Sequence, residues 1–165
     1  MIIFLDIDGC LATHSSYIHR DYPDAPPRRR PGLHKPAVAV LEAFFQRGKD
    51  HIVISSAWRI YGLRGVRKTL RELGLKLPIM DITRNPVGID HDPSLRGKGR
   101  GNEILDWIKE NHYDGDYLVI DDEIFDIRGT IPEEKICYVE NGWLHEGLTA
   151  KHLEPFKRPR IGKKK

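Results

Sequence analysis

Cysteine is scarce in this sequence, with only Cys10 and Cys137 among 165 residues. Two cysteines so far apart provide neither a disulfide framework nor the paired ligands of a zinc site. Long hydrophobic runs are also missing, and no stretch approaches the roughly 18 apolar residues of a membrane-spanning helix. The opening segment, residues 1–9, has no basic flank and no cleavage site, so we expect no signal peptide. These features favour a reduced, cytoplasmic protein without a membrane partner.

Charge of one sign is not in large excess, because 27 Lys and Arg residues face 24 Asp and Glu residues. Six of the basic residues lie in the last nine positions, 157–165, which contain no acid. Without these six, the acidic residues outnumber the remaining 21 basic ones. We therefore expect one mildly acidic domain over residues 1–156 and a basic tail over 157–165. This distribution is not that of a basic DNA-binding domain.

Short apolar runs alternate with amphipathic segments along the chain. Strands are predicted at Ile2–Leu5, His51–Ile54, Leu77–Asp81, Tyr117–Ile120 and Lys135–Val139. Helices are predicted at 36–48, 62–73, 102–111 and 148–153. This alternation is typical of an α/β fold, a Rossmann-like three-layer sandwich with a central, mostly parallel sheet. Residues 10–35 are rich in Pro and Arg and show no periodicity, so we expect a small cap or loop insertion there.

Three of the predicted strands end in pairs of polar residues. These pairs are Asp6 with Asp8, Ser55 with Ser56, and Asp121 with Asp122. Ligands bind beyond the carboxyl ends of parallel strands, so we expect the pairs to meet at one edge of the sheet. Four carboxylates there would repel one another without a cation, and Mg²⁺ suits such oxygen ligands. A carboxylate cluster with Mg²⁺, hydroxyls and basic donors is suited to phosphoryl transfer.

Four segments in the right order resemble the signatures of the haloacid dehalogenase-like (HAD) hydrolases. They are Phe4–Gly9, Ile52–Ser56, Arg100–Ile104 and Leu118–Asp122. Two further details, Ser55–Arg59 and Gly147–Thr149, are similar to the HAD domain of RNA-repair proteins and their stand-alone phage and bacterial relatives. The resemblance covers about residues 1 to 155.

The resemblance implies catalytic and metal-binding roles. Asp6 would be the nucleophile that forms an aspartyl-phosphate. Asp8 would be the general acid for the leaving group and then the base for the attacking water. The Mg²⁺ ligands would be Asp6, the backbone carbonyl of Asp8, and Asp121 and Asp122.

The resemblance also implies donors to the substrate phosphate. Ser55 would bind the phosphoryl oxygens, with Ser56 as the alternative if the strand ends one residue later. Arg100 would be the basic residue, with Lys98 as a second candidate for that role. Arg59 lies close in sequence to the serines, and both a phosphate contact and a surface ion pair are open for it.

The expected function is Mg²⁺-dependent hydrolysis of phosphomonoesters. A minimal cap would leave the site open to bulky substrates such as RNA or DNA ends or nucleotides. The arginine run Arg28–Arg30 and the basic tail would attract such phosphate-rich partners. Two other functions stay open: a phosphatase of sugar phosphates or mononucleotides, and an inactive HAD fold that binds nucleic acid or a protein partner.

Overall fold

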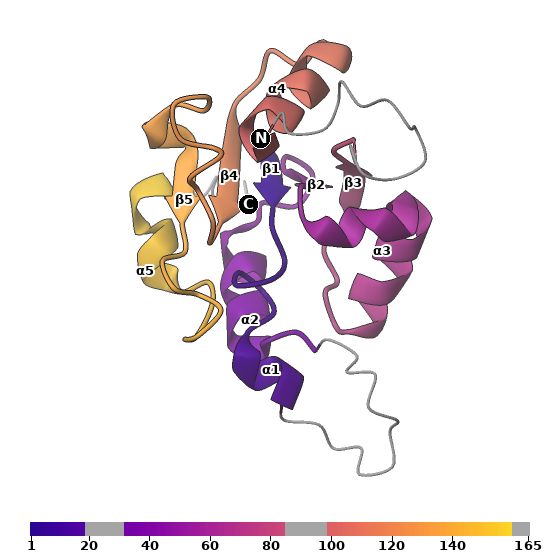
Figure 1. Ribbon diagram of the computed structural model, residues 1–165, viewed down its shortest axis with the longest axis vertical. Helices are drawn as coiled ribbons and strands as arrows, with labels where there is room; N and C mark the ends of the chain where they lie inside the picture. Colours follow the sequence, from indigo (N-terminus) through magenta and orange to yellow (C-terminus); the bar gives the residue numbers. More distant parts are fainter. Residues whose placement is uncertain (19–31, 85–98, 160–165) are drawn as a thin grey trace, which may run out of the picture.

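The computed structural model describes residues 1–18, 32–84 and 99–159. Its five strands are β1 (Ile2–Leu5), β2 (His51–Ile54), β3 (Ile79–Ile82), β4 (Tyr117–Asp121) and β5 (Ile136–Tyr138). They form one all-parallel sheet in the order β3-β2-β1-β4-β5 (Figure 1). Buried parallel strands are near-continuous apolar runs, which is why the sequence pattern marks them clearly.

Helices cover both faces of this sheet. They are α1 (His14–Ile18), α2 (Lys35–Phe44), α3 (Gly62–Glu72), α4 (Gly99–Glu110) and α5 (Ala150–Leu153), with 3₁₀-helices η1 (Ala57–Tyr61), η3 (Glu133–Lys135) and η4 (Glu154–Phe156). Side chains alternate along each strand, so β1 contributes Ile3 and Leu5 to a core with α2, α3 and α5. Ile2 and Phe4 face the opposite way, into a core with α4. The predicted three-layer α/β fold is therefore confirmed.

Several element boundaries differ from the predicted ones. The third strand begins at Ile79 rather than Leu77, which fits the missing N–H of Pro78. The helix predicted to end at Gly48 stops at Phe44, because Phe45 takes an extended conformation. The insertion predicted without periodicity contains the five-residue helix α1. Arg28–Arg30 lie outside the described residues.

The order of the strands creates one switch point in the sheet. From β1 the chain moves outward to β2 and β3, and it then returns through α4 to β4 on the other side of β1. Connections therefore leave β1 and β4 in opposite directions. In open α/β sheets the ligand binds in the crevice outside the carboxyl ends of such strands. Within the parts of the chain that are described, no helix is long and apolar enough to cross a membrane.

Arg158, which we assigned to the basic tail, pairs with the domain. Its guanidinium donates to both oxygens of the buried Asp50 carboxylate, with 2.6 Å between the atoms in each bond. Its Cζ atom also lies 5.1 Å from the centre of the Phe44 ring. Asp50 faces the N-terminal amine at 3.5 Å as well. These contacts tie the chain after η4 to the start of β2.

Truncation at two positions separates this pairing from the remaining basic residues. Deleting residues 157–165 should destabilise the fold by about 2–3 kcal/mol, because it leaves the Asp50 carboxylate buried without its guanidinium. Deleting 160–165 keeps Arg158 and should leave stability unchanged. Thermal unfolding of the two truncated proteins measures the difference, expected at roughly 5–10 °C. Equal melting temperatures would contradict a structural role for Arg158.

Candidate active site

Three carboxylates meet at the switch point between β1 and β4. Asp6 directly follows β1, Asp121 ends β4 and Asp122 follows it. The backbone N–H of Asp6 donates to the carbonyl of Ile120 at 2.9 Å, which holds the two strand ends together. Burial raises the pKa of Asp6 well above its usual value, and the nearby Asp121 charge raises it further. Burial and Asp121 also raise the pKa of Asp122 to about 6. These three acids lie together at one edge of the sheet, as the strand ends predicted.

Arg100 is the cation that the structure places at these carboxylates. Its Nη1 atom lies 2.5 Å from Asp121 Oδ2 and 3.2 Å from Asp6 Oδ1. Burial by itself lowers the pKa of Arg100, but the charges of Asp6 and Asp121 more than offset this effect. The other candidate, Lys98, lies outside the described residues. Among the described residues, the contacting guanidinium is that of Arg100 and the carboxylates number three, so the ionised site carries an excess of negative charge.

Asp126 positions Arg100 although it is distant in sequence. Its carboxylate accepts a hydrogen bond from the Arg100 backbone N–H at 2.9 Å, and its carbonyl accepts one from Gly101 at 3.2 Å. These bonds satisfy N–H groups at the start of α4, as a helix cap does. Helix α4 therefore begins at Gly99, before the predicted start at Asn102. The contacts of Asp126 are thus those of a helix cap.

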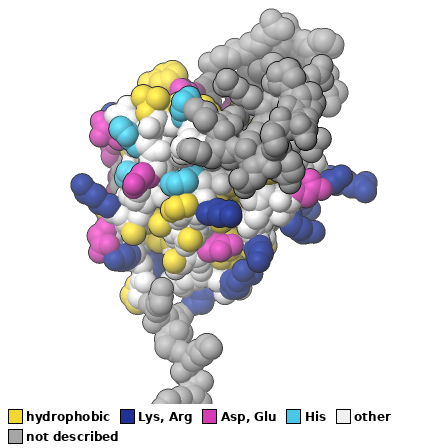
Figure 2. Space-filling view, turned by 90° about the horizontal axis from the view of Figure 1, so that it is seen from below, with side chains coloured by type: hydrophobic (Ala, Val, Ile, Leu, Met, Phe, Trp, Pro, Cys, Tyr) yellow, Lys and Arg dark blue, Asp and Glu magenta, His cyan; other side chains and the backbone are white. Residues whose placement is uncertain are grey.

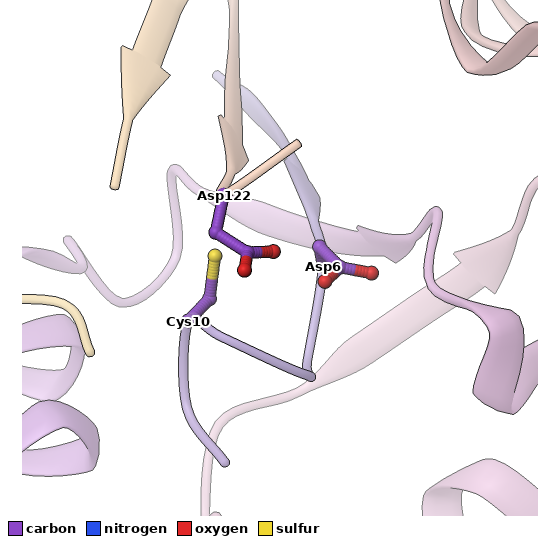
Figure 3. Close-up of side chains that lie close together, drawn as sticks. All are labelled: Asp6, Cys10 and Asp122. Carbon is purple, nitrogen blue, oxygen red and sulfur yellow. The ribbon is translucent and has the colours of Figure 1, made fainter. Parts of the chain in front are cut away.

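Gly9 and Cys10 complete the wall beside Asp122. Gly9 has φ +75°, and a Cβ atom there would lie 1.8 Å from Asp122 Oδ2, so the carboxylate occupies the space that a side chain would need. Figure 3 shows Asp6, Cys10 and Asp122 side by side, and one potential ligand atom of each lies within 4.8 Å of the others. Burial raises the pKa of the Cys10 thiol. Sequence inspection gave Cys10 no role, and no sequence spacing signals this proximity.

Asp8 is held by a residue from the loop after β2. The indole Nε1–H of Trp58 donates to Asp8 Oδ2 at 3.0 Å. Trp58 is buried, and Asp8 is half-buried. The bond fixes the position of one Asp8 oxygen beside the ends of β1 and β2. This hydrogen bond gives Trp58 a positioning role.

The two serines after β2 have different surroundings, although both are buried. The Ser56 hydroxyl donates to the Asp6 carboxylate, and its oxygen accepts from the backbone N–H of Trp58 at 3.4 Å. Ser55 Oγ has no hydrogen-bond partner among the described residues. The structure therefore brings Ser56 to the expected nucleophile and leaves Ser55 with an unused hydroxyl.

Arg59 has partners within the protein. It is 9% exposed, and its Nη2 atom lies 2.7 Å from Glu103 Oε2 in α4. Its Nη1 atom donates to the Ser55 carbonyl and, at 3.3 Å, to Thr83 Oγ1 after β3. Arg59 thus links the ends of β2 and β3 to α4. Its contact with a substrate phosphate stays a prediction. The Glu103 pairing went unpredicted, although Glu103 lies in the Arg100–Ile104 signature.

Comparison with known proteins adds one match. A family model described as the HAD domain in Swiss Army Knife RNA repair proteins matches residues 2–153. No curated protein and no solved structure matches the chain. The match spans every element from β1 to α5, including all the residues gathered at the switch point. By fold, by the acids at its strand ends and by this match, the chain belongs to the family of HAD domains found in Swiss Army Knife RNA repair proteins.

Proposed function

We propose that the chain is a Mg²⁺-dependent phosphomonoesterase that works through an aspartyl-phosphate on Asp6. The observation that carries the proposal is the cluster of Asp6, Asp121 and Asp122 at the switch point, where Arg100 contacts the first two. Membership in a HAD family supports phosphatase-type hydrolysis. Burial, with repulsion from Asp121, raises the pKa values of Asp6 and Asp122, and a bound cation would favour their ionised forms.

The donors at this site suit Mg²⁺. The oxygens of Asp6, Asp122 and Asp121, with the Asp8 carbonyl, would hold the ion, since Mg²⁺ prefers carboxylates, carbonyls and water. Cys10 offers a soft sulfur with a raised pKa, which a hard ion does not select. When bound, Mg²⁺ would neutralise charge on the phosphoryl oxygens.

The side chains divide the chemistry between them. An Asp6 oxygen attacks phosphorus and forms the aspartyl-phosphate, while the bond to the ester oxygen breaks and Asp8 gives that oxygen its proton. Asp8 then takes a proton from water, whose oxygen attacks phosphorus and displaces Asp6, and inorganic phosphate leaves. Trp58 keeps Asp8 oriented through both steps. Arg100 and Ser56 hold the Asp6 carboxylate in place.

A substrate panel tests the proposal. We infer that polynucleotide ends or nucleotides are the substrates, which fits the RNA repair proteins named by the matching family. The panel compares 3′- and 5′-phosphorylated RNA and DNA oligonucleotides, mononucleotides, sugar phosphates and a small aryl phosphate, each with Mg²⁺ or EDTA. Preferred turnover of sugar phosphates would favour a metabolite phosphatase. A chain that hydrolyses none of them with Mg²⁺ would be the inactive binding module instead.

The stability of the metal-free protein should fall as the pH rises through the acidic range. Asp6 and Asp122 have folded-state pKa values above the ordinary 3.8, about 6 for Asp122. Between pH 3.8 and these raised pKa values, the folded protein binds more protons than the unfolded chain, so raising the pH lowers the stability. Mg²⁺ binds the ionised carboxylates and should restore the loss.

Thermal unfolding in EDTA and in Mg²⁺ measures this effect at about pH 5 and about pH 8. The gain in melting temperature from Mg²⁺ should be larger at the higher pH. The Asp122→Asn variant removes one of the two acids and should flatten the decline in EDTA. A Mg²⁺ gain that is the same at both pH values would count against an ion held by these carboxylates.

A further inference from the structure

An exposed aromatic residue ends η1, three positions after Trp58. Trp58, which donates to Asp8, belongs to η1, and this short helix ends in Ile60 and Tyr61. These two side chains are 64% and 61% exposed. With a rise of about 2 Å per residue in a 3₁₀-helix, Tyr61 lies one turn, about 6 Å, along the axis from Trp58.

Tyr61 ends η1, and after a turn at Gly62 (φ 65°, ψ 165°) a row of exposed cations follows along α3. The residues are spaced three, four and three apart, and we call them the α3 stripe: Tyr61, Arg64, Lys68 and Arg71. The residues of α3 that pack on the core have the same spacing, two positions later: Leu63, Val66, Leu70 and Leu73. Two residues correspond to about 200° around a helix, so Arg64, Lys68 and Arg71 lie opposite the core-facing side of α3.

The α3 stripe carries positive charge that the helix itself hardly offsets. Glu72 is the single acid in α3, and it lies 3.9 Å from Lys68 in an exposed pair, which is a weak interaction. Arg67 faces another way, because it donates to the carbonyls of Ile79 and Met80 at 2.9 and 2.7 Å. From Arg64 to Arg71 the cations span about 10 Å.

The base of Tyr61 is seated against α3. A Cβ atom on Gly65 would lie 2.9 Å from Tyr61 Cβ, so the glycine leaves the room that this side chain occupies. The aromatic residue is thereby joined to the first turn of the basic helix. Figure 2 views the molecule from the end where the strands finish, and its Lys and Arg side chains lie mostly around the rim of the described surface.

We propose that the α3 stripe binds the backbone of a single-stranded polynucleotide whose phosphorylated end occupies the Asp6 site. Proteins that bind single strands combine a row of cations along the backbone with an aromatic ring that stacks on a base. The stripe has both, and it begins at the end of the short helix whose Trp58 donates to Asp8. A sugar phosphate would not extend along 10 Å of helix. The proposal rests on the proposed function and gives its substrate class.

Binding of a fluorescent, terminally phosphorylated oligonucleotide to the Asp6→Asn protein tests the stripe without turnover. Fluorescence anisotropy at several salt concentrations gives the affinity and its salt dependence. In the triple variant Arg64→Gln, Lys68→Gln, Arg71→Gln, the slope of log K against log salt should become shallower by about 2, which is about 0.7 for each lost phosphate contact. The matched control is Arg47→Gln, Lys49→Gln, Lys109→Gln, which removes as much charge near the start of β2 and the end of α4.

Tyr61 has its own pair of variants. Tyr61→Ala should weaken binding on the order of 10- to 100-fold through lost stacking, and Tyr61→Phe should retain the affinity. If the stripe triple and the control triple have the same affinity for the oligonucleotide and the same salt dependence, the proposal is overturned. A polyglutamate peptide that binds the wild-type stripe as tightly as the oligonucleotide would also overturn it, because the surface would then suit acidic proteins.

The same proteins separate this proposal from the proposed function. The ratio of kcat/KM for the oligonucleotide to that for a small aryl phosphate should fall in the stripe triple and stay constant in the control. If the aryl phosphate is hydrolysed and the ratio does not change in the stripe triple, the phosphatase proposal is supported and the proposed role of the α3 stripe is contradicted. If oligonucleotide binding depends on the stripe but no ester is hydrolysed, the binding role of the α3 stripe is supported and the phosphatase proposal is contradicted.

Discussion

Replacing Asp6 by Asn should abolish phosphatase activity, with a loss on the order of 10⁴-fold or more in kcat. The amide cannot form the bond to phosphorus that the carboxylate forms. Its neutral oxygen is also a weaker Mg²⁺ ligand than a carboxylate oxygen. Hydrolysis of a small aryl phosphate in Mg²⁺ measures the loss. The matched control is Asp114→Asn, at an exposed position before β4, which should retain full activity.

The same variant should be more stable than the wild type when no metal is present. Asp6 is 4% exposed and faces two further carboxylates, so its ionised form costs folding free energy. Asn removes that charge, and thermal unfolding in EDTA should show a higher melting temperature. A stabilised but inactive protein is what a functional carboxylate predicts, whereas loss of both would indicate a structural residue.

Beryllofluoride adds a direct assignment of the nucleophile. This phosphoryl mimic should bind the wild type with Mg²⁺ and be found bonded to an Asp6 oxygen in a crystal structure. A beryllofluoride group on Asp8 or Asp122 would show that this residue, and not Asp6, is the nucleophile. Unchanged aryl phosphate turnover in Asp6→Asn would remove the aspartyl-phosphate mechanism altogether.

Replacing Arg100 by Ala should damage both stability and activity. The guanidinium contacts Asp121 at 2.5 Å and Asp6 at 3.2 Å, and without it the three acids repel one another unopposed. Loss of one partner from a buried ion pair costs about 3 kcal/mol, or roughly 10 °C in melting temperature for a chain of this size. Activity should fall about 10²- to 10³-fold, as for removal of a positioned donor.

Two companion variants identify the cause. Arg84→Ala removes an arginine from an exposed pair with Glu110, 3.2 Å apart, and should change stability by less than about 1 kcal/mol. Adding Asp121→Asn to Arg100→Ala should recover much of the stability, since the repulsion is then reduced, but not the activity. If the double variant is as unstable as Arg100→Ala, the guanidinium acts through packing rather than charge.

The fold and the edge where the acids meet could be predicted because both depend on local patterns. Ile2–Leu5, His51–Ile54 and Tyr117–Ile120 are apolar runs of strand length, and each is followed by polar residues. Parallel strands must deliver those residues to the same edge of the sheet. Side-chain contacts within the edge were harder to predict. Neither the Ser56 bond to Asp6 nor the proximity of Cys10 to Asp122 follows from spacing.

Local sequence patterns were enough to predict the strands of the parallel sheet, the order of the signatures and the kind of atoms that meet at the switch point. Tertiary structure decided which partner each charged group meets. Asp126 starts α4 from 26 residues away, and Arg158 pairs with Asp50 across 108 residues. Hydrophobic patterns repeat every 2 or 3.6 residues and are visible locally. An ion pair forms where segments distant in the chain pack together, and that depends on the complete fold.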